Sequence, residues 1–140
     1  MMLSSAKACP AVQEIPGRSS AEKALAAAHR GGRRSFFYAA VFLADHLPEI
    51  IEQGDYETAD RALLSFCQHL AGVFDPAAHI YRWSGTSLVV MMERHVPVDV
   101  LEWEISRIPV SGARRLFPVA QYPTSDQLCR EIDLFVAQNL

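Results

Sequence analysis

The chain has 140 residues, the length of one domain of ordinary size. Half of its residues are apolar and 21% are charged, which excludes a disordered or low-complexity chain. The formal net charge is −3, so the composition has neither the basic excess of a nucleic-acid-binding protein nor a polybasic membrane anchor. We therefore expect one globular domain with no nucleic-acid partner.

The cysteines and the apolar runs indicate the compartment. Cys9, Cys67 and Cys129 are odd in number and far apart, which is typical neither of a disulfide scaffold nor of a zinc site built from CxxC pairs. We expect free thiols in a reducing compartment. The most apolar run, residues 36–44, is much shorter than the ~20 residues that span a bilayer, and no apolar signal segment precedes the first prolines. These features predict a cytoplasmic protein with no membrane insertion.

Apolar residues at helical spacing follow an N-terminal arm of residues 1–19 and belong to a single domain over residues 20–140. The predicted helices cover residues 20–29, 48–53, 56–74, 96–108 and 125–139. Ser20, Asp55 and Ser125 are the expected N-cap residues. In the fourth helix, the spacing places Val100 and Leu101 on the buried side, together with two later isoleucines.

Four short apolar runs predict strands at residues 36–43, 79–83, 88–92 and 115–121. The first run has almost no polar residue, which indicates a central strand covered on both faces. A Ser-Gly-Thr-Ser turn joins the second and third runs into a hairpin, and Pro118 favours an edge position for the last strand. The element order predicts an α+β fold, with a ferredoxin-like or palm-type antiparallel or mixed sheet flanked by helices.

Motifs of catalytic or phosphate-binding chemistry are missing from the sequence. It contains no HExxH, no GxxxxGK[ST] and no GxGxxG, and its five histidines form no pair with metal-ligand spacing. The Ser-Gly-Thr-Ser turn joins two predicted strands, whereas a nucleophilic serine elbow joins a strand to a helix. Arg30, Arg33 and Arg34 form a basic cluster that either holds a phosphate or is a solvated loop at a helix end.

Five segments together resemble one family. Residues 14–18 read EIPGR, 37–46 read FYAAVFLADH, 81–88 read YRWSGTSL, and 119–123 read VAQYP, and a last helix carries Asp133. In the same order they resemble the GLPNR stretch, the first core strand ending in DxDHFK, the ARYGGDEF hairpin, the IGVAxYP strand and the RADxALYxAK helix of GGDEF domains. The resemblance runs from about residue 10 to residue 140. GGDEF domains are the fold of diguanylate cyclases, which condense two GTP molecules into cyclic di-GMP.

This resemblance implies that the catalytic carboxylates are missing. The family places Mg²⁺ between the first Asp of DxDHFK and the acidic pair of the hairpin, and these positions are Leu43, Thr86 and Ser87 here. Ser84 replaces the first hairpin glycine and Gly85 retains the second. A leucine and two hydroxyls cannot hold Mg²⁺ against the charge of GTP. We expect a degenerate domain with no enzymatic activity, no metal and no cofactor.

The nucleotide-reading positions are partly retained. The resemblance places Ile51 on the family's guanine-reading Asn and Asp60 on its Asp, while the inhibitory RxxD motif reads DPAA at residues 75–78. Asp60 either keeps a guanine contact or simply favours the dipole of its helix. One hypothesis is therefore a receptor that binds GTP or cyclic di-GMP without turnover, through Asp60, the 84–87 turn and the cluster of Arg30, Arg33 and Arg34.

The leading hypothesis is a protein-interaction or regulatory module, because a fold kept without its catalytic groups indicates binding. The resemblance implies a bacterial, cyclic di-GMP-linked process such as exopolysaccharide secretion, biofilm formation or motility, with a partner protein from a secretion or signalling system. Trp83 and Trp103 are candidate anchors because tryptophan is enriched in interface hot spots. The alternative is that both belong to the core. GGDEF domains often act as dimers because each half-site holds one GTP, a reason that disappears here, so a homodimer stays one open alternative for the oligomeric state.

Overall fold

The computed structural model describes residues 15–45, 47–74 and 77–140. Most of the predicted arm, including Cys9, and the predicted helix break at residues 75–76 lie outside these ranges. The helices are α2 (Arg18–Arg30), α3 (Leu47–Glu52), α4 (Tyr56–Val73), α5 (Val98–Ser106) and α6 (Ser125–Gln138), with the 3-10 turns η2 (Arg34–Phe36) and η3 (Val119–Gln121). The strands are β1 (Phe37–Leu43), β2 (His79–Ser84), β3 (Ser87–Glu93) and β4 (Arg114–Pro118).

The strands form one four-stranded sheet in the order β2-β3-β1-β4. All three pairings are antiparallel, and β2 and β3 form the predicted hairpin. This order confirms the α+β, ferredoxin-like prediction, and the described sheet is antiparallel throughout. β4 lies at an edge, as Pro118 indicated.

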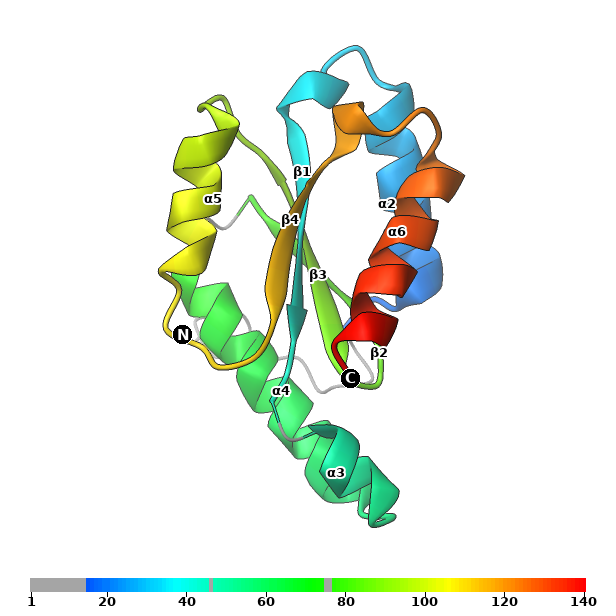
Figure 1. Cartoon of the computed structure of the whole chain (residues 1–140), viewed down its shortest axis with the longest axis vertical. Coiled ribbons are helices and arrows are strands. Elements are labelled where there is room, and N and C mark those ends of the chain that lie inside the picture. Colours follow the sequence, from blue (N-terminus) through cyan, green and yellow to red (C-terminus); the bar gives the residue numbers. More distant parts are fainter. Residues whose placement is uncertain (1–14, 46, 75–76) are drawn as a thin grey trace, which may run out of the picture.

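Helices cover both faces of the sheet, with α4 and α5 on one side and α2 and α6 on the other (Figure 1). β1 lies between β3 and β4, and its side chains alternate between the two layers. Phe42 packs with Leu63 of α4 and Leu101 of α5, whereas Val41 packs on the opposite face with Leu128 of α6. The prediction of a central strand buried on both faces is therefore confirmed.

Of the three predicted N-cap residues, the structure confirms one. Asp55 caps α4 as predicted, since its carboxylate accepts a hydrogen bond from the backbone N–H of Thr58 at 3.1 Å. The Ser20 cap was wrong, because α2 begins at Arg18, inside the predicted arm, after Gly17. The Ser125 cap was also wrong. Thr124 takes this place, and its hydroxyl accepts from the N–H of Gln127 at 3.1 Å.

Two predictions in the C-terminal half of the chain, the burial of Val100 and the end of the last strand, were wrong. Val100 is 42% exposed, because the buried side of α5 carries Leu101 and Ile105 and turns Val100 outward. The last strand ends at Pro118 and does not continue to residue 121. Residues Val119–Gln121 form η3 instead, in which Val119 is buried and the chain turns toward α6.

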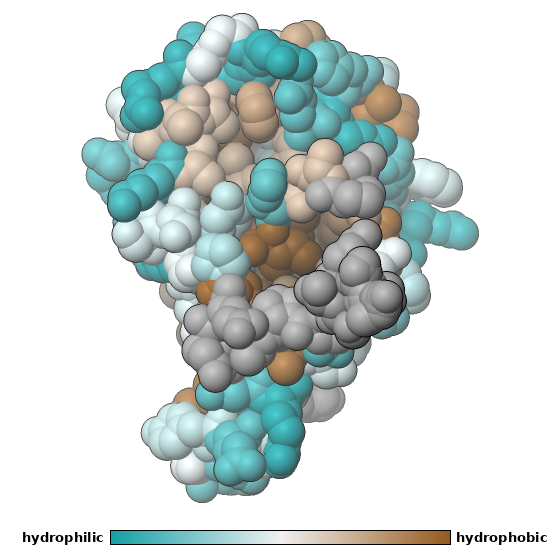
Figure 2. Space-filling view, turned by 180° about the vertical axis from the view of Figure 1, so that it is seen from behind, coloured by the Kyte–Doolittle hydropathy of each residue, from teal (hydrophilic) through white to brown (hydrophobic). Residues whose placement is uncertain are grey.

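On the face opposite to the view of Figure 1, a hollowed area exposes apolar side chains among polar ones (Figure 2). Among the described residues, no helix combines the length and apolar character needed to cross a membrane.

Candidate functional site: the hairpin and the end of β1

The end of β1 lies against the β2–β3 turn. Leu43 is the register partner of Ser87, and the backbone N–H of Ala44 donates to the carbonyl of Thr86 at 2.9 Å. The three positions that the family resemblance assigns to metal ligands, 43, 86 and 87, are therefore neighbours in space. We call Leu43, Ser84, Thr86 and Ser87 the β1–hairpin junction.

The hydroxyl groups of the β1–hairpin junction bond to one another. The Oγ atoms of Ser84 and Ser87 lie 2.6 Å apart, and Ser84 Oγ is 3.4 Å from Thr86 Oγ1. Ser84 Oγ also accepts the backbone N–H of Thr86 at 3.2 Å. Ser87 is fully buried and Thr86 is 8% exposed. These hydroxyls satisfy each other inside the protein, which is what buried polar groups require.

Leu43 fills the other half of the junction with an alkyl side chain. It is 4% exposed and belongs to the apolar layer beneath α2 and α6. The loop before β4 is hydrogen-bonded to the backbone of Leu43, because the N–H of Leu43 donates to the carbonyl of Ala113 at 2.9 Å. Gly112 has a φ of +112°, and a Cβ there would lie 2.0 Å from the Leu43 carbonyl oxygen. Only glycine fits this close approach.

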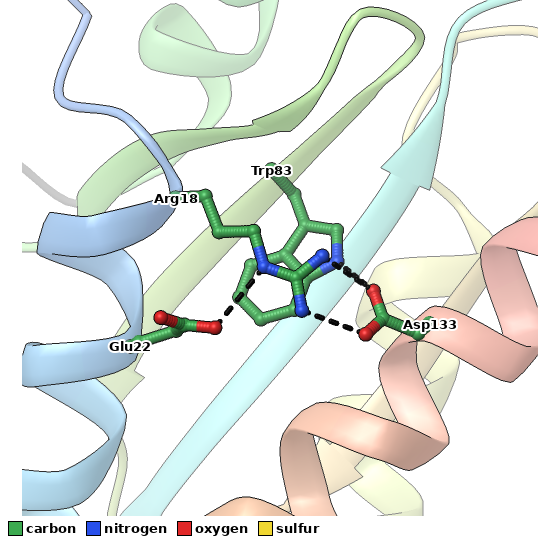
Figure 3. A network of polar contacts seen from close by, with 4 residues as sticks. All are labelled: Arg18, Glu22, Trp83 and Asp133. Carbon is green, nitrogen blue, oxygen red and sulfur yellow. Dashed lines mark hydrogen bonds and ion pairs between the residues drawn. The ribbon is translucent and has the colours of Figure 1, made fainter.

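A second polar arrangement lies one residue before the turn, and it joins α2, β2 and α6 (Figure 3). The indole N–H of Trp83 donates to Asp133 Oδ1 at 2.9 Å, and the Arg18 guanidinium lies 4.2 Å from the centroid of the indole ring. Arg18 donates two hydrogen bonds of 2.7 Å to the Asp133 carboxylate and one of 3.1 Å to Glu22. We call these four residues the Trp83 cluster.

The charges of the Trp83 cluster reinforce one another. Partial burial acts to raise the pKa of Asp133, but the hydrogen bonds from Arg18 and Trp83 and the charge of Arg18 outweigh it, so the pKa lies below its ordinary value. The hydrogen bond with Asp133 in turn raises the pKa of Arg18. Both groups are therefore charged at neutral pH, and the ion pair connects the first helix of the described chain to the last.

The fold is also found in solved structures. No family model and no curated protein sequence matches this chain. It resembles a diguanylate cyclase/phosphodiesterase from Caldicellulosiruptor saccharolyticus, with a TM-score of 0.68 and 10% identity over 99% of this chain and 90% of that one. It also resembles the GGDEF domain of YfiN from Pseudomonas aeruginosa, with a TM-score of 0.64 and 20% identity over 89% of this chain and 90% of that one. The chain has the fold of a GGDEF domain.

A third similar structure is the diguanylate cyclase SiaD from Pseudomonas aeruginosa in complex with its activator SiaC. The TM-score is 0.62 and the identity 14%, over 94% of this chain and 57% of the SiaD chain. The likeness at these identities concerns the fold. With the GGDEF fold established, the positions compared in the sequence can be examined for their chemistry.

Mg²⁺ does not fit the β1–hairpin junction. The ion requires hard oxygen ligands in near-octahedral geometry, and carboxylates supply them in proteins. The Leu43 side chain offers only carbon atoms, and the hydroxyls of Thr86 and Ser87 bond within the junction. Elsewhere in the described part of the chain, no group of three or more His, Cys, Asp or Glu side chains could hold a metal ion.

The positions compared with guanine-reading residues are occupied by structural contacts. Asp60 forms an ion pair of 3.2 Å with Arg82, which connects α4 to β2. Ile51 of α3 lies beside the turn, since a Cβ on Gly85 would be 3.6 Å from its Cδ1 atom. The carboxylate of Asp60 therefore has a partner in the fold itself, and an apolar side chain occupies the neighbouring position.

The basic cluster lies at the other end of the sheet. Arg33 pairs with Glu93, and Glu93 is the register partner of Phe37 at the start of β1. The hairpin turn lies at the opposite end of this seven-residue strand, about 20 Å away at 3.4 Å per residue. The prediction that Arg30, Arg33 and Arg34 share one nucleotide site with the turn is therefore wrong.

The two tryptophans have different environments. Trp83 is 3% exposed, so its prediction as an interaction anchor is wrong, and the core alternative is confirmed. Trp103 is 59% exposed on the outer side of α5, close to Val100. The Arg107 guanidinium lies 5.2 Å from its ring centroid. Trp103 is available for contact with another molecule, as the anchor prediction requires.

The Trp83 cluster was not predicted, although the sequence held a signal for it. Arg18 and Asp133 are 115 residues apart, so no local pattern connects them. Both residues, however, lie on charged positions of the motifs quoted above, at the end of EIPGR and in the last helix. Two opposite charges retained at motif positions while the metal ligands are absent could have indicated this ion pair.

Proposed function

We propose that this chain is a catalytically inactive domain of the GGDEF fold that acts as a protein-interaction or regulatory module in a cyclic di-GMP-linked process. The chemistry of the β1–hairpin junction carries the proposal. Leu43, Thr86 and Ser87 supply no carboxylate for a metal and no base for a ribose hydroxyl. Without these groups, binding is the property for which the fold remains suited.

The similar structures support the setting. Diguanylate cyclases are named among them, which connects the fold to cyclic di-GMP. SiaD in complex with SiaC is an example of a protein containing this fold that is bound by an activator protein. Exopolysaccharide secretion, biofilm formation and motility are the processes in which we expect such a module, with a partner protein from the same system.

The surface of α5 supports a role in binding. Trp103 and Val100 place two large apolar side chains on one exposed side of the helix, where Arg107 also lies. Tryptophan and arginine, like tyrosine, are enriched in interface hot spots. Trp103→Ala should therefore weaken capture of the partner while leaving the fold intact. Tyr56→Ala, which removes another exposed aromatic ring, is the matched control.

Inactivity is tested by incubating the purified chain with GTP and Mg²⁺ and separating the nucleotides by chromatography. We expect no cyclic di-GMP and no loss of GTP beyond a protein-free sample. Metal-dependent formation of cyclic di-GMP would overturn the proposal. Titration calorimetry with GTP and cyclic di-GMP tests the receptor hypothesis in the same preparation, and binding that Asp60→Ala abolishes would favour a receptor.

A further inference from the structure

We propose that the open edge of β4 is a docking site for an extended segment of a partner protein that carries acidic side chains. The inference rests on the proposed interaction function and names the kind of partner. Figure 1 shows β4 in front of β1, with α5 on one side, α6 on the other and no described helix crossing the strand. β4 is an edge strand, so one of its sides has no partner strand in the described chain.

The register fixes which backbone groups point outward. In an antiparallel pair, residues alternate between those that bond to the neighbouring strand and those that point away from it. The bond from the N–H of Leu43 to the carbonyl of Ala113 shows that Leu43 bonds toward β4. Counting from this pair, Arg115 and Phe117 bond to β1. Arg114 and Leu116 therefore point their N–H and C=O groups away from the sheet.

These outward groups have no hydrogen-bond partner among the described residues. Leu116 is 7% exposed, so little of the residue, its backbone groups included, is in contact with solvent. Buried or recessed backbone groups are almost always paired with protein or water. An added strand would supply the N–H and C=O groups that the Leu116 backbone needs. Pro118 offers only a carbonyl, which limits the site to the middle of β4.

A groove of about 380 Å³ follows this edge. Its apolar lining comes from Val98 and Ile105 of α5, Leu116 of β4 and Tyr122. An extended segment places alternate side chains on opposite sides. One set would enter this groove while the backbone pairs with β4, which is the arrangement of proteins that bind peptides by strand addition.

The charges around the edge favour an acidic segment. Arg115 is exposed, lies 4.7 Å over the Phe117 ring and has no carboxylate partner in the described chain. Arg114 donates to the carbonyls of Ile105 and Ile108 at 3.1 and 2.6 Å, and it forms no ion pair with a carboxylate of the described residues. Glu102 is the one carboxylate that lines the groove. A second copy of this chain would bring its own Arg114 and Arg115 to the same edge, where the like charges repel one another.

The test begins with a displayed library of random nine-residue peptides, selected on the full chain and on the Arg115→Glu variant. We expect peptides enriched on the unmodified chain to carry Asp or Glu at alternate positions. The best of them, added to isotope-labelled protein, should slow hydrogen exchange of the Leu116 amide. Arg115→Glu should weaken its binding by about tenfold, since an attractive charge pair becomes repulsive. Arg130→Glu makes the same change in charge on α6 and should leave the affinity unchanged.

Several outcomes would overturn the proposal. One is that no peptide is enriched; another is that the enriched peptides are not acidic or protect amides of α5 and not Leu116. A Leu116 amide that is already protected in the free chain, together with a dimer in sedimentation, would assign the edge to a second copy. Each of these results leaves the proposed function standing as long as the chain makes no cyclic di-GMP. Turnover of GTP would overturn the proposed function whatever the peptides show.

Discussion

The β1–hairpin junction and the Trp83 cluster adjoin each other on β2, and they are held together by different chemistry. In the Trp83 cluster, charged residues retained at motif positions meet through two hydrogen bonds of 2.7 Å between Arg18 and Asp133. In the β1–hairpin junction, Leu43 and the hydroxyls of Thr86 and Ser87 stand at the positions compared with metal ligands, and they pack and bond among themselves. The two regions therefore satisfy their polar groups in different ways, the Trp83 cluster by an ion pair between two helices and the β1–hairpin junction by hydroxyls that bond to one another.

Leu43→Asp introduces a carboxylate at the β1–hairpin junction and should have the largest effect on stability. It places a charge in an apolar layer where the side chain is 4% exposed, and we expect a loss of about 4 kcal/mol in the free energy of unfolding. Urea denaturation measures this loss. Leu134→Asp, at a position 48% exposed on α6, is the control and should cost less than 1 kcal/mol. Recovery of the lost stability by millimolar Mg²⁺ would show that the junction still accommodates the ion.

Gly112→Ala tests the close contact between the loop before β4 and the end of β1. The added Cβ would lie 2.0 Å from the Leu43 carbonyl oxygen at a φ of +112°, so we expect a loss of about 3 kcal/mol, measured in the same way. Gly72→Ala in α4 is the control. Its Cβ meets no atom within 4 Å, and helix propensity predicts a gain of up to about 1 kcal/mol. Equal stability of the two variants would mean that Gly112 does not lie in close contact with the Leu43 carbonyl.

A double-mutant cycle sharpens the other half of the comparison. Arg18→Ala and Asp133→Ala should each destabilise the chain, and their coupling energy should be about 1 kcal/mol, since the pair is bidentate but more than one-third exposed. The i,i+4 pair of Arg61 and Glu57 on α4 provides the comparison, and its coupling should be no more than about 0.5 kcal/mol. Additive effects of Arg18→Ala and Asp133→Ala would show that the ion pair does not stabilise the contact between α2 and α6.

The pH dependence should show the smallest effect. The pKa of Asp133 is lower in the folded chain than in the unfolded chain, so its contribution to stability is complete above the unfolded value and is lost as the pH falls through the folded value. The midpoint temperature of thermal unfolding, measured from pH 6 to pH 2, should therefore fall less steeply below about pH 4 in Asp133→Asn than in the unmodified chain. Identical slopes would contradict the lowered pKa.

The sequence predicted the architecture well because the strongest signals are local. The apolar run of β1 and the capping side chain of Asp55 depend on neighbouring residues alone, and both were confirmed. The cap at Ser125 was missed because Thr124 stands beside it, and the pattern does not choose between two neighbouring hydroxyl residues. The cap at Ser20 was missed because α2 begins after Gly17, which has no side chain to mark a helix start. The early end of β4 was missed because burial of Val119 turns the chain after Pro118.

The site was predicted in part. The meeting of Leu43 with Thr86 and Ser87 followed from the family resemblance and is confirmed by the β1–β3 register. The surroundings of Trp83 could not be predicted from spacing, because the indole bonds to Asp133, which is 50 residues away and on another element. The separation of Arg33 from the turn depends on the direction of β1, which apolar patterns do not give.

Titration of the isotope-labelled chain with Mn²⁺ in the presence of GTP tests the central claim most directly. Mn²⁺ favours the same oxygen ligands as Mg²⁺, and its unpaired electrons broaden the signals of nearby nuclei. The structure predicts that the amide signals of Ala44, Thr86 and Ser87 keep the width they have without metal, because the junction between them is filled by Leu43 and by hydroxyls that bond to one another. Selective, saturable broadening of these signals would show that the junction binds a divalent ion and would contradict the account.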